Sequence, residues 1–194
     1  MRNPKWLIVG GLSLALLGVC ALMLLAAWGG IGALQTSGVR FRFFGVDRVS
    51  AQADEEQRFT VNTPAALDVA NDAGDITVTA GTDSEIVVTA HKTAWGMSQA
   101  DAEAALAAIK IVVTQDGSEV TVRVEQPAEV DVVHIGPGGG LVDFTIAVPA
   151  QTDVVAHTQF GAVKAVGTHG DADLQSNAGE VSASGLEGGD LKLK

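Results

Sequence analysis

The alternation of apolar and polar residues, interrupted by glycine, predicts short β-strands along most of this chain. The pattern is clearest near the C-terminus, where residues 160–167 line up with residues 178–185, and residues 170–174 with residues 189–193. A third copy begins upstream at residues 73–79. A period of two, closed by Gly and Asp about every 20 residues, is typical of stacked β repeats that bury their apolar side against their neighbours. We therefore expect an all-β, solenoid-like stack of short glycine-punctuated strands.

One segment in the middle of the chain has a helical pattern instead. Ser98 and Asp101 resemble a capping box, in which the serine hydroxyl binds an early backbone N–H and the carboxylate reaches back. The alanine-rich residues 100–108 follow and have high helix propensity. We expect one short helix here, covering one end or side of the stack. The strands expected upstream of the terminal repeats are residues 59–61, 67–69, 76–78, 86–88, 111–113, 120–124 and 142–148.

The N-terminal segment has the length and composition of a membrane anchor. Residues 6–28 carry no charge and end in a tryptophan on each side, and about 20 apolar residues are enough to cross a bilayer. A cleaved signal peptide has a shorter apolar region, although residues 27–29 would offer a cleavage site. A lipoprotein signal at Cys20 fits less well because Val19 precedes the cysteine. We predict a single retained transmembrane helix.

The domain organisation follows from this anchor. The tail of residues 1–5 is predicted to be cytoplasmic, residues 29–57 to form a stalk, and residues 58–194 to form the β-repeat domain outside the cytoplasm. Basic residues flank the helix on both sides, so this orientation rests on the short tail and on the small effect of a long acidic domain on topology. The chain ends inside a repeat at Lys194, and we expect the natural protein to continue.

The charge distribution excludes some classes of partner. The net charge is −11, made up of +4 through Arg48 and −15 from Val49 onward. Nucleic acid and anionic lipid surfaces both require clustered Lys and Arg, which the acidic domain lacks. The single cysteine, Cys20, lies in the apolar segment, so the domain has no disulfide framework and no thiolate metal site.

Four features together resemble a known bacterial family, the putative-adhesin domain family. They are residues 67–78, residues 93–96 before the expected helix, residues 145–149 and the terminal Gly-Asp/Glu repeats. The resemblance covers about residues 59–194. It implies a β-solenoid-like or β-sandwich-like repeat fold in the cell envelope, often anchored by one transmembrane helix. It implies no catalytic residues.

The candidate metal ligands are weak. His91, His134, His157 and His169 lack the short spacing of a metal pair, so surface or loop positions are favoured, although neighbouring repeats could bring His157 and His169 together. Calcium could bind Asp171 and Asp173 or residues 71–75. The twelfth position from Asn71 is Thr82, however, where a calcium loop needs Glu, so solvated turn carboxylates are favoured.

No other pattern in the sequence indicates an active site. Residues 136–140 are glycine-rich but lack the Lys-Ser/Thr of a phosphate loop. Phe59, Trp95, Phe144 and Phe160 are expected in the core or at its ends rather than as a binding platform. We predict no catalytic, cofactor or metal site, and no enzyme.

Two functions remain open. The first is a membrane-anchored, extracytoplasmic, adhesin-like interaction module that binds the bilayer through residues 6–28. It would bind a protein partner, or another copy of itself, by a strand edge near Lys192. The alternative is an envelope sensor or regulatory subunit that signals through its single transmembrane helix.

Overall fold

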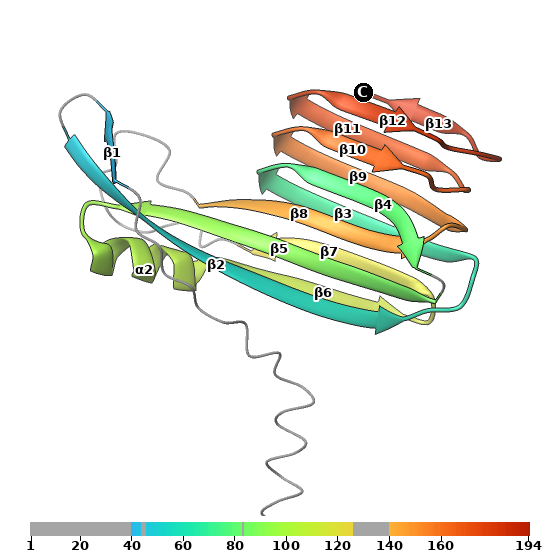
Figure 1. Ribbon diagram of the computed structural model, residues 1–194, viewed down its shortest axis with the longest axis horizontal. Helices are drawn as coiled ribbons and strands as arrows, with labels where there is room; N and C mark the ends of the chain where they lie inside the picture. Colours follow the sequence, from blue (N-terminus) through green and yellow to red (C-terminus); the bar gives the residue numbers. More distant parts are fainter. Residues whose placement is uncertain (1–39, 44–45, 83, 126–139) are drawn as a thin grey trace, which may run out of the picture. The chain divides into compact units, whose positions relative to one another are not determined.

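The computed structural model describes residues 40–43, 46–82, 84–125 and 140–194 (Figure 1). The expected cytoplasmic tail, transmembrane helix (6–28) and first part of the stalk lie outside these ranges, as do His134 and residues 136–139. Within the described ranges, no helix has the length and apolar character needed to cross a membrane.

Two β-sheets form the described part of the protein. The first sheet has the order β1-β2-β5-β8-β4-β10-β12 and the second β13-β11-β9-β3-β7-β6. The first comprises β1 (Arg40–Phe43), β2 (Val46–Thr60), β5 (Glu85–Gly96), β8 (Leu141–Pro149), β4 (Ile76–Thr82), β10 (Val163–Val166) and β12 (Val181–Ser184). The second comprises β13 (Leu191–Leu193), β11 (Ala172–Ala178), β9 (Thr152–Phe160), β3 (Ala65–Ala73), β7 (Glu119–Glu125) and β6 (Lys110–Asp116). The expected all-β class is confirmed, whereas two mixed sheets do not establish a solenoid.

The sequence repeats pair in parallel register. Val163 of β10 lies beside Val181 of β12, and Ala172 of β11 lies beside Leu191 of β13. The upstream copy joins the same ladder, because Ile76 of β4 lies beside Val163 on its other side. We use the word rung for one strand of each sheet together with the corner that joins them. Figure 1 shows these rungs stacked toward the C-terminus.

The order of the rungs in space differs from their order in the sequence. β4 lies between β8 and β10, and β3 lies between β7 and β9. All four flanking strands come later in the chain. The β3–β4 rung is therefore inserted among strands that are made after it.

The core lies between the two sheets and follows the alternation of the strands. In β3 the residues facing the core are buried, and their neighbours Ala66, Asp68 and Ala70 are partly exposed. Burying a Val, Leu or Ile side chain contributes about 1.5–3 kcal/mol, so this row of small and branched residues holds the sheets together. The largest fully buried side chains are Phe144, Leu67, Ile76, Ile86, Ile146 and Leu174.

The stalk expected at residues 29–57 is wrong for its last part, because residues 46–57 belong to β2. This strand pairs antiparallel with β5 from Val49 to Thr60. Its buried positions include Ser50, Ala51 and Ala53, which are small and weakly hydrophobic, and Asp54 and Glu56 alternate with them on the exposed side. Small residues in this part of the β2–β5 pair leave room for a helix to pack closely against it.

That helix is α2 (Gln99–Ala108), which confirms the expected position. The Ser98 hydroxyl accepts a hydrogen bond from the Asp101 N–H (3.2 Å) and donates one to the Asp101 carboxylate (2.8 Å). The helix packs on β2 and β5 through its buried Ala102 and Leu106. It therefore lies against one end of these two long strands (Figure 1).

Candidate functional site

A row of polar side chains, buried at Asn71 and Thr158 and partly exposed at Ser176, connects successive rungs at the corner after β3, β9 and β11, here called the first corner. The Asn71 amide donates to the Val142 carbonyl (2.7 Å). In the next rung the Thr158 hydroxyl donates to the Gly74 carbonyl (3.2 Å), and in the following one the Ser176 hydroxyl donates to the Gly161 carbonyl (2.7 Å). Each rung is thus fixed to the preceding one by a side chain at the same place.

Glycine occupies the same corner in each rung because the backbones approach closely there. A Cβ atom built on Gly74, Gly161 or Gly179 would lie closer than 3.0 Å to the carbonyl of the preceding rung, a separation that real Cβ atoms essentially never show. The second corner, which leads from the first sheet into β11 and β13, has the same property at Gly170 and Gly189. The glycines that punctuate the sequence are therefore required by the stacking.

Aspartate carboxylates also bind the backbone of the following rung. At the second corner, Asp153 Oδ1 accepts from the Asp171 N–H (2.8 Å), and Asp171 Oδ1 accepts from the Asp190 N–H (2.9 Å). At the first corner, Asp75 plays this part for the Ala162 N–H (2.7 Å). The carboxylates suggested as calcium ligands at residues 71–75 and Asp171 thus include hydrogen-bond acceptors between rungs.

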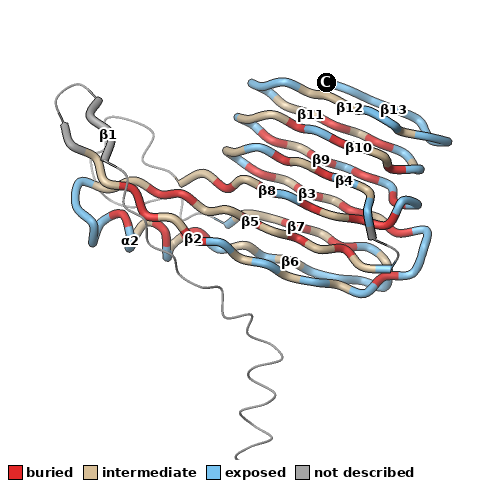
Figure 2. The backbone as a smooth tube through the Cα atoms, viewed as in Figure 1, coloured by how far each residue is buried: buried red, intermediate tan, exposed pale blue. Residues whose placement is uncertain are grey.

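The last rung of the chain, β12 and β13, is called the terminal rung. Leu191 and Leu193 are 48% and 46% exposed, whereas Ala172 and Leu174, beside them in β11, are 2% and 0% exposed. Figure 2 shows the change from buried to exposed positions between β11 and β13. The terminal rung therefore presents core-type side chains to solvent in this structure.

The backbone of the terminal rung is paired on one side only within the described residues. The Lys194 N–H donates to the Leu174 carbonyl, and the Asp190 carbonyl accepts from the Ala172 N–H. In a strand, alternate residues direct their backbone groups to opposite sides. Lys192 is therefore directed toward β11, and Leu191 and Leu193 are directed toward the unpaired edge.

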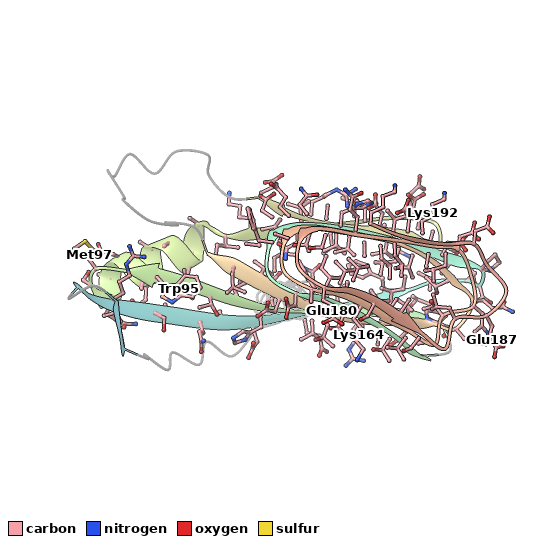
Figure 3. All side chains as sticks on the ribbon, turned by 90° about the horizontal axis from the view of Figure 1, so that it is seen from above. Trp95, Met97, Lys164, Glu180, Glu187 and Lys192 are labelled. Atoms are coloured by element: carbon pink, nitrogen blue, oxygen red, sulfur yellow. The ribbon has the colours of Figure 1, made fainter. Side chains whose placement is uncertain are left out.

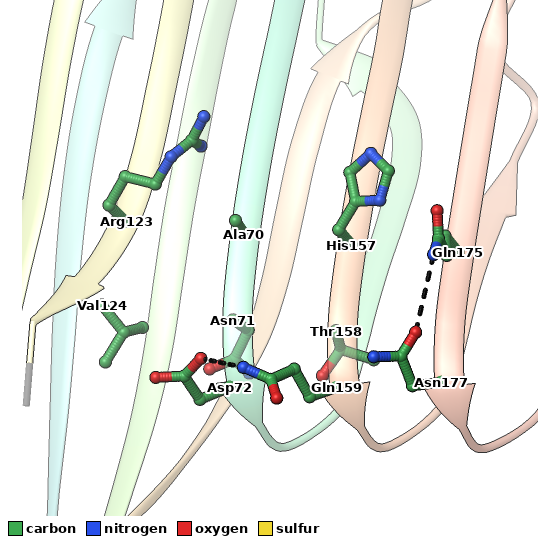
Figure 4. A pocket seen from close by; sticks show the side chains of 10 residues that line it. All are labelled: Ala70, Asn71, Asp72, Arg123, Val124, His157, Thr158, Gln159, Gln175 and Asn177. Atoms are coloured by element: carbon green, nitrogen blue, oxygen red, sulfur yellow. Dashed lines mark hydrogen bonds between the residues drawn. The ribbon is translucent and has the colours of Figure 1, made fainter.

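A second surface feature is a groove of about 310 Å³ on the outer face of the second sheet, here called the Ala70 groove (Figure 4). Register places Arg123, Ala70, His157 and Gln175 side by side on β7, β3, β9 and β11. Ala70 is much smaller than its neighbours, so the surface is hollowed between Arg123 and His157. The remaining lining is Asn71, Asp72, Val124, Thr158, Gln159 and Asn177.

Several side chains of the Ala70 groove are hydrogen-bonded to one another or to a neighbouring residue. The Arg123 guanidinium forms an ion pair with the Asp68 carboxylate and donates to the Asp68 carbonyl (3.1 Å). The Gln159 amide donates to the Asp72 carboxylate (2.7 Å). Amide, guanidinium, imidazole and carboxylate groups can bind polar ligands, but this lining contains no Phe, Tyr or Trp side chain.

The three histidines in the described ranges, His91, His157 and His169, are not brought together. His91 pairs with the Asp54 carboxylate across β5 and β2. His157 lies on β9 beside Ala70, whereas the His169 N–H donates to the Ala150 carbonyl before β9 begins. Across the described ranges, no three His, Cys, Asp or Glu side chains are grouped so that they could hold a metal ion.

The aromatic residues divide between the core and the surface. Phe144 is buried, as expected, and Phe59 packs against the core. Phe160 was expected in the core or at its end, but it is 62% exposed, because the alternation of β9 ends at Thr158 as the chain enters the first corner.

Sequence reasoning missed the Ala70 groove and the hydrogen bonds between rungs. Arg123 and His157 are far apart in the sequence, and only the parallel register of β7, β3 and β9 aligns them. The rows of corner residues had a usable signal. Thr158 and Ser176, like Gly161 and Gly179, occupy equivalent positions in the two aligned repeats.

Comparisons with known proteins do not assign the chain to a family. No family profile matches it, and no curated protein matches its sequence. Among solved structures it is similar to a putative cell adhesion protein from Clostridium sporogenes, with 8% identity and a TM-score of 0.32 over 73% of this chain and 99% of that one. It is also similar to a putative adhesin from Bacteroides fragilis, with 12% identity and a TM-score of 0.28 over 73% of this chain and 96% of that one.

Proposed function

We propose that this protein is a non-catalytic, adhesin-like interaction module that binds a protein partner through the terminal rung. The observation that carries the proposal is the exposure of Leu191 and Leu193, whose equivalents in the preceding rung, Ala172 and Leu174, are buried. The last rung of such a stack presents the kind of surface that is buried between the other rungs.

The mechanism is the addition of a strand to this edge. The outward-directed backbone groups of Leu191 and Leu193 supply hydrogen bonds to a partner strand, while their side chains supply apolar contact. On the opposite sheet, the Val163 N–H donates to the Glu180 carbonyl, so that Val181 and Ala183 are directed outward in the same way. Two adjacent edges can therefore be covered by one partner.

The edge at the other end of the first sheet is less suited to such a partner. Within the described residues, β2 pairs with β1 only through residues 46–49, and the rest of this edge carries Asp54, Glu56 and Arg58 on its exposed side. Charged side chains on an edge strand oppose pairing with another chain. The terminal rung has uncharged residues at its four edge-directed positions instead.

The test uses Leu193→Pro, with Leu193→Val as the matched control. Proline removes an outward-directed N–H, whereas valine keeps it. Leu193 is preferable to Lys192, because a proline at Lys192 would break the pairing with β11. A photo-crosslinking residue at Ser182 of the 194-residue chain should capture a partner in cells with Leu193→Val and lose it with Leu193→Pro. Equal capture by both variants would refute strand addition.

We further propose that residues 6–28 anchor the protein in the cell membrane with the β domain outside the cytoplasm. The uncharged, tryptophan-flanked segment supports this proposal. Protease treatment of intact cells should remove a C-terminal tag without lysis. A tag that survives until the membrane is opened would place the domain inside.

A further inference from the structure

The strand β6 forms the edge of the second sheet that lies farthest from β13. Among the described residues, β6 pairs only with β7, so its other side is an open edge (Figure 1). We propose that two copies of this protein associate at this edge, with their β6 strands antiparallel about a two-fold axis beside Val113. The inference is independent of the proposed function, because the terminal rung lies at the opposite edge of the sheet.

The backbone of β6 directs three residues toward the open side. The Ser118 carbonyl accepts a hydrogen bond from the Ala66 N–H, so alternate residues of β7 from Ser118 onward face β3. The residues between them face β6, beginning with Glu119, which lies beside Asp116 across the turn. Every second residue of β6, counted back from Asp116, is therefore hydrogen-bonded to β7. The residues directed outward are Ile111, Val113 and Gln115.

A two-fold axis beside Val113 brings all of these backbone groups into pairs. In antiparallel pairing about this axis, Val113 faces Val113 of the second copy, and Ile111 faces Gln115 of the second copy. Each pair joins two outward-directed residues, so each can exchange an N–H and a carbonyl. Moving the register by two residues would leave either Ile111 or Gln115 without a partner in the facing β6. The symmetric register therefore forms the most hydrogen bonds.

The side chains of β6 complement themselves in the same register. Lys110 lies opposite Asp116 of the second copy, and Val112 lies opposite Thr114. Opposite charges directly across an antiparallel pair are stabilising, and like charges are destabilising. Among the described residues, neither Lys110 nor Asp116 forms an ion pair in its own chain. Val112 is 36% exposed, and covering it in the dimer is favourable.

The strand β6 lacks the features that keep edge strands from pairing. Its charged side chains lie only at its two ends, whereas β2 carries Asp54, Glu56 and Arg58 along its length. Its register with β7 is unbroken from end to end, without the bulge or proline that protects many edges. The Gln115 side chain donates to the Thr60 carbonyl (2.7 Å) and holds the strand against β2. The edge is therefore regular and already in place.

The expected assembly is a weak and reversible dimer. Each copy contributes one strand of 7 residues, and such a contact should bury less than the roughly 1,200 Å² of a stable interface. Because β6 and β13 lie at opposite edges, pairing through β6 joins the two second sheets into one and leaves both terminal rungs at its far ends.

The first test reverses the charges of the interface. Lys110→Glu places like charges opposite one another at both ends of the paired strands, and so does Asp116→Lys. Sedimentation of the full 194-residue chain in detergent gives the dissociation constant of the dimer, and far-UV circular dichroism checks that each variant is folded. We expect each single variant to raise this constant about tenfold, and the double variant to restore it to within about twofold, because opposite charges again face each other.

The matched control for the charge is Lys164→Glu. Lys164 is exposed on β10 and projects outward from the first sheet (Figure 3). This variant changes the net charge as much as Lys110→Glu and should leave the dissociation constant unchanged. An equal effect of the two variants, or a double variant that does not recover, would refute the pairing of Lys110 with Asp116. An original chain that stays monomeric at every concentration would refute the dimer.

The second test fixes the register with a disulfide between copies. Val112 and Thr114 of the two copies should form a non-hydrogen-bonded pair with Cα atoms about 4.5 Å apart, which a disulfide can bridge. One chain carries Val112→Cys and a differently tagged chain carries Thr114→Cys, and Cys20 is replaced by serine in both. Mild oxidation should link the mixed pair, whereas either chain alone should be linked much less. Equal linkage of either chain with itself would overturn the register.

Discussion

Replacing Gly161 by alanine tests whether the close approach of the rungs limits stability. Gly161 has φ +138°, in a region that L side chains rarely adopt, and its Cβ would collide with the Gly74 carbonyl. That carbonyl accepts a hydrogen bond from the Thr158 hydroxyl (3.2 Å). The substitution therefore strains the backbone and displaces a hydrogen-bonded group at the same point.

The expected magnitude is the sum of these effects. A residue forced into such a conformation costs about 1–3 kcal/mol, and leaving a buried hydrogen-bonding group unpaired costs about 1–3 kcal/mol. Alanine also lowers the conformational entropy of the unfolded chain, which offsets about 0.4–1 kcal/mol of this loss of stability. We expect Gly161→Ala to lower the free energy of unfolding by about 3 kcal/mol.

Two other glycines provide matched controls. Gly117 has φ +59°, but no atom lies within 4 Å of the position that a Cβ would occupy, so Gly117→Ala should cost only the conformational part, about 1–2 kcal/mol. Gly81 has neither constraint, and Gly81→Ala should be neutral or slightly stabilising, because glycine weakens strands. Guanidinium unfolding followed by far-UV circular dichroism measures all three. Equal losses for Gly161→Ala and Gly117→Ala would show that the rungs relax at no cost.

Two further changes test the core and the helix. Leu174→Ala removes a fully buried side chain and should lower the free energy of unfolding by about 2–5 kcal/mol in the same experiment. Leu193→Ala, at the half-exposed position beside it, should lower it by about 1 kcal/mol. Equal losses of stability would contradict the burial difference between β11 and β13. Ser98→Ala removes the oxygen that accepts a hydrogen bond from the Asp101 N–H and should lower the free energy of unfolding by about 1 kcal/mol. Ser98→Asn keeps a capping oxygen and should lower it less. If amide hydrogen exchange in α2 is the same in both variants, the capping role of Ser98 is contradicted.

Local pattern was sufficient to predict the terminal repeats and the helix. The offset between Val163 and Val181 is visible in the sequence because the same residues recur at the same places, and the structure pairs them. The Ser98 cap and the alanines that follow are likewise a local signal. These elements could be predicted because each depends on neighbours that are close in the sequence or copied from it.

The order of the strands within the sheets could be predicted only where a repeat marks it, because parallel pairing between strands of unlike sequence leaves no mark in either strand. Ile76 lies between Phe144 and Val163, which are both distant in the sequence. The first part of β2, before the strand expected at residues 59–61, was missed because Ala51 and Ala53 are small enough to be mistaken for linker residues beside Asp54 and Glu56. The Ala70 groove depends on register between three strands, so neither Arg123 nor His157 alone indicates it.

The insertion of the β3–β4 rung also affects how the chain can be made and shortened. During synthesis, β3 and β4 emerge before β7, β8, β9 and β10, the four strands that pair with them. Until those strands follow, both edges of the early rung are open, and such edges pair readily with other chains. Pairing across 87 positions, as between Asp75 and Ala162, also slows folding. Deleting residues 65–82 would separate the two halves of both sheets, whereas deleting the terminal rung would leave β3 and β4 paired on both sides.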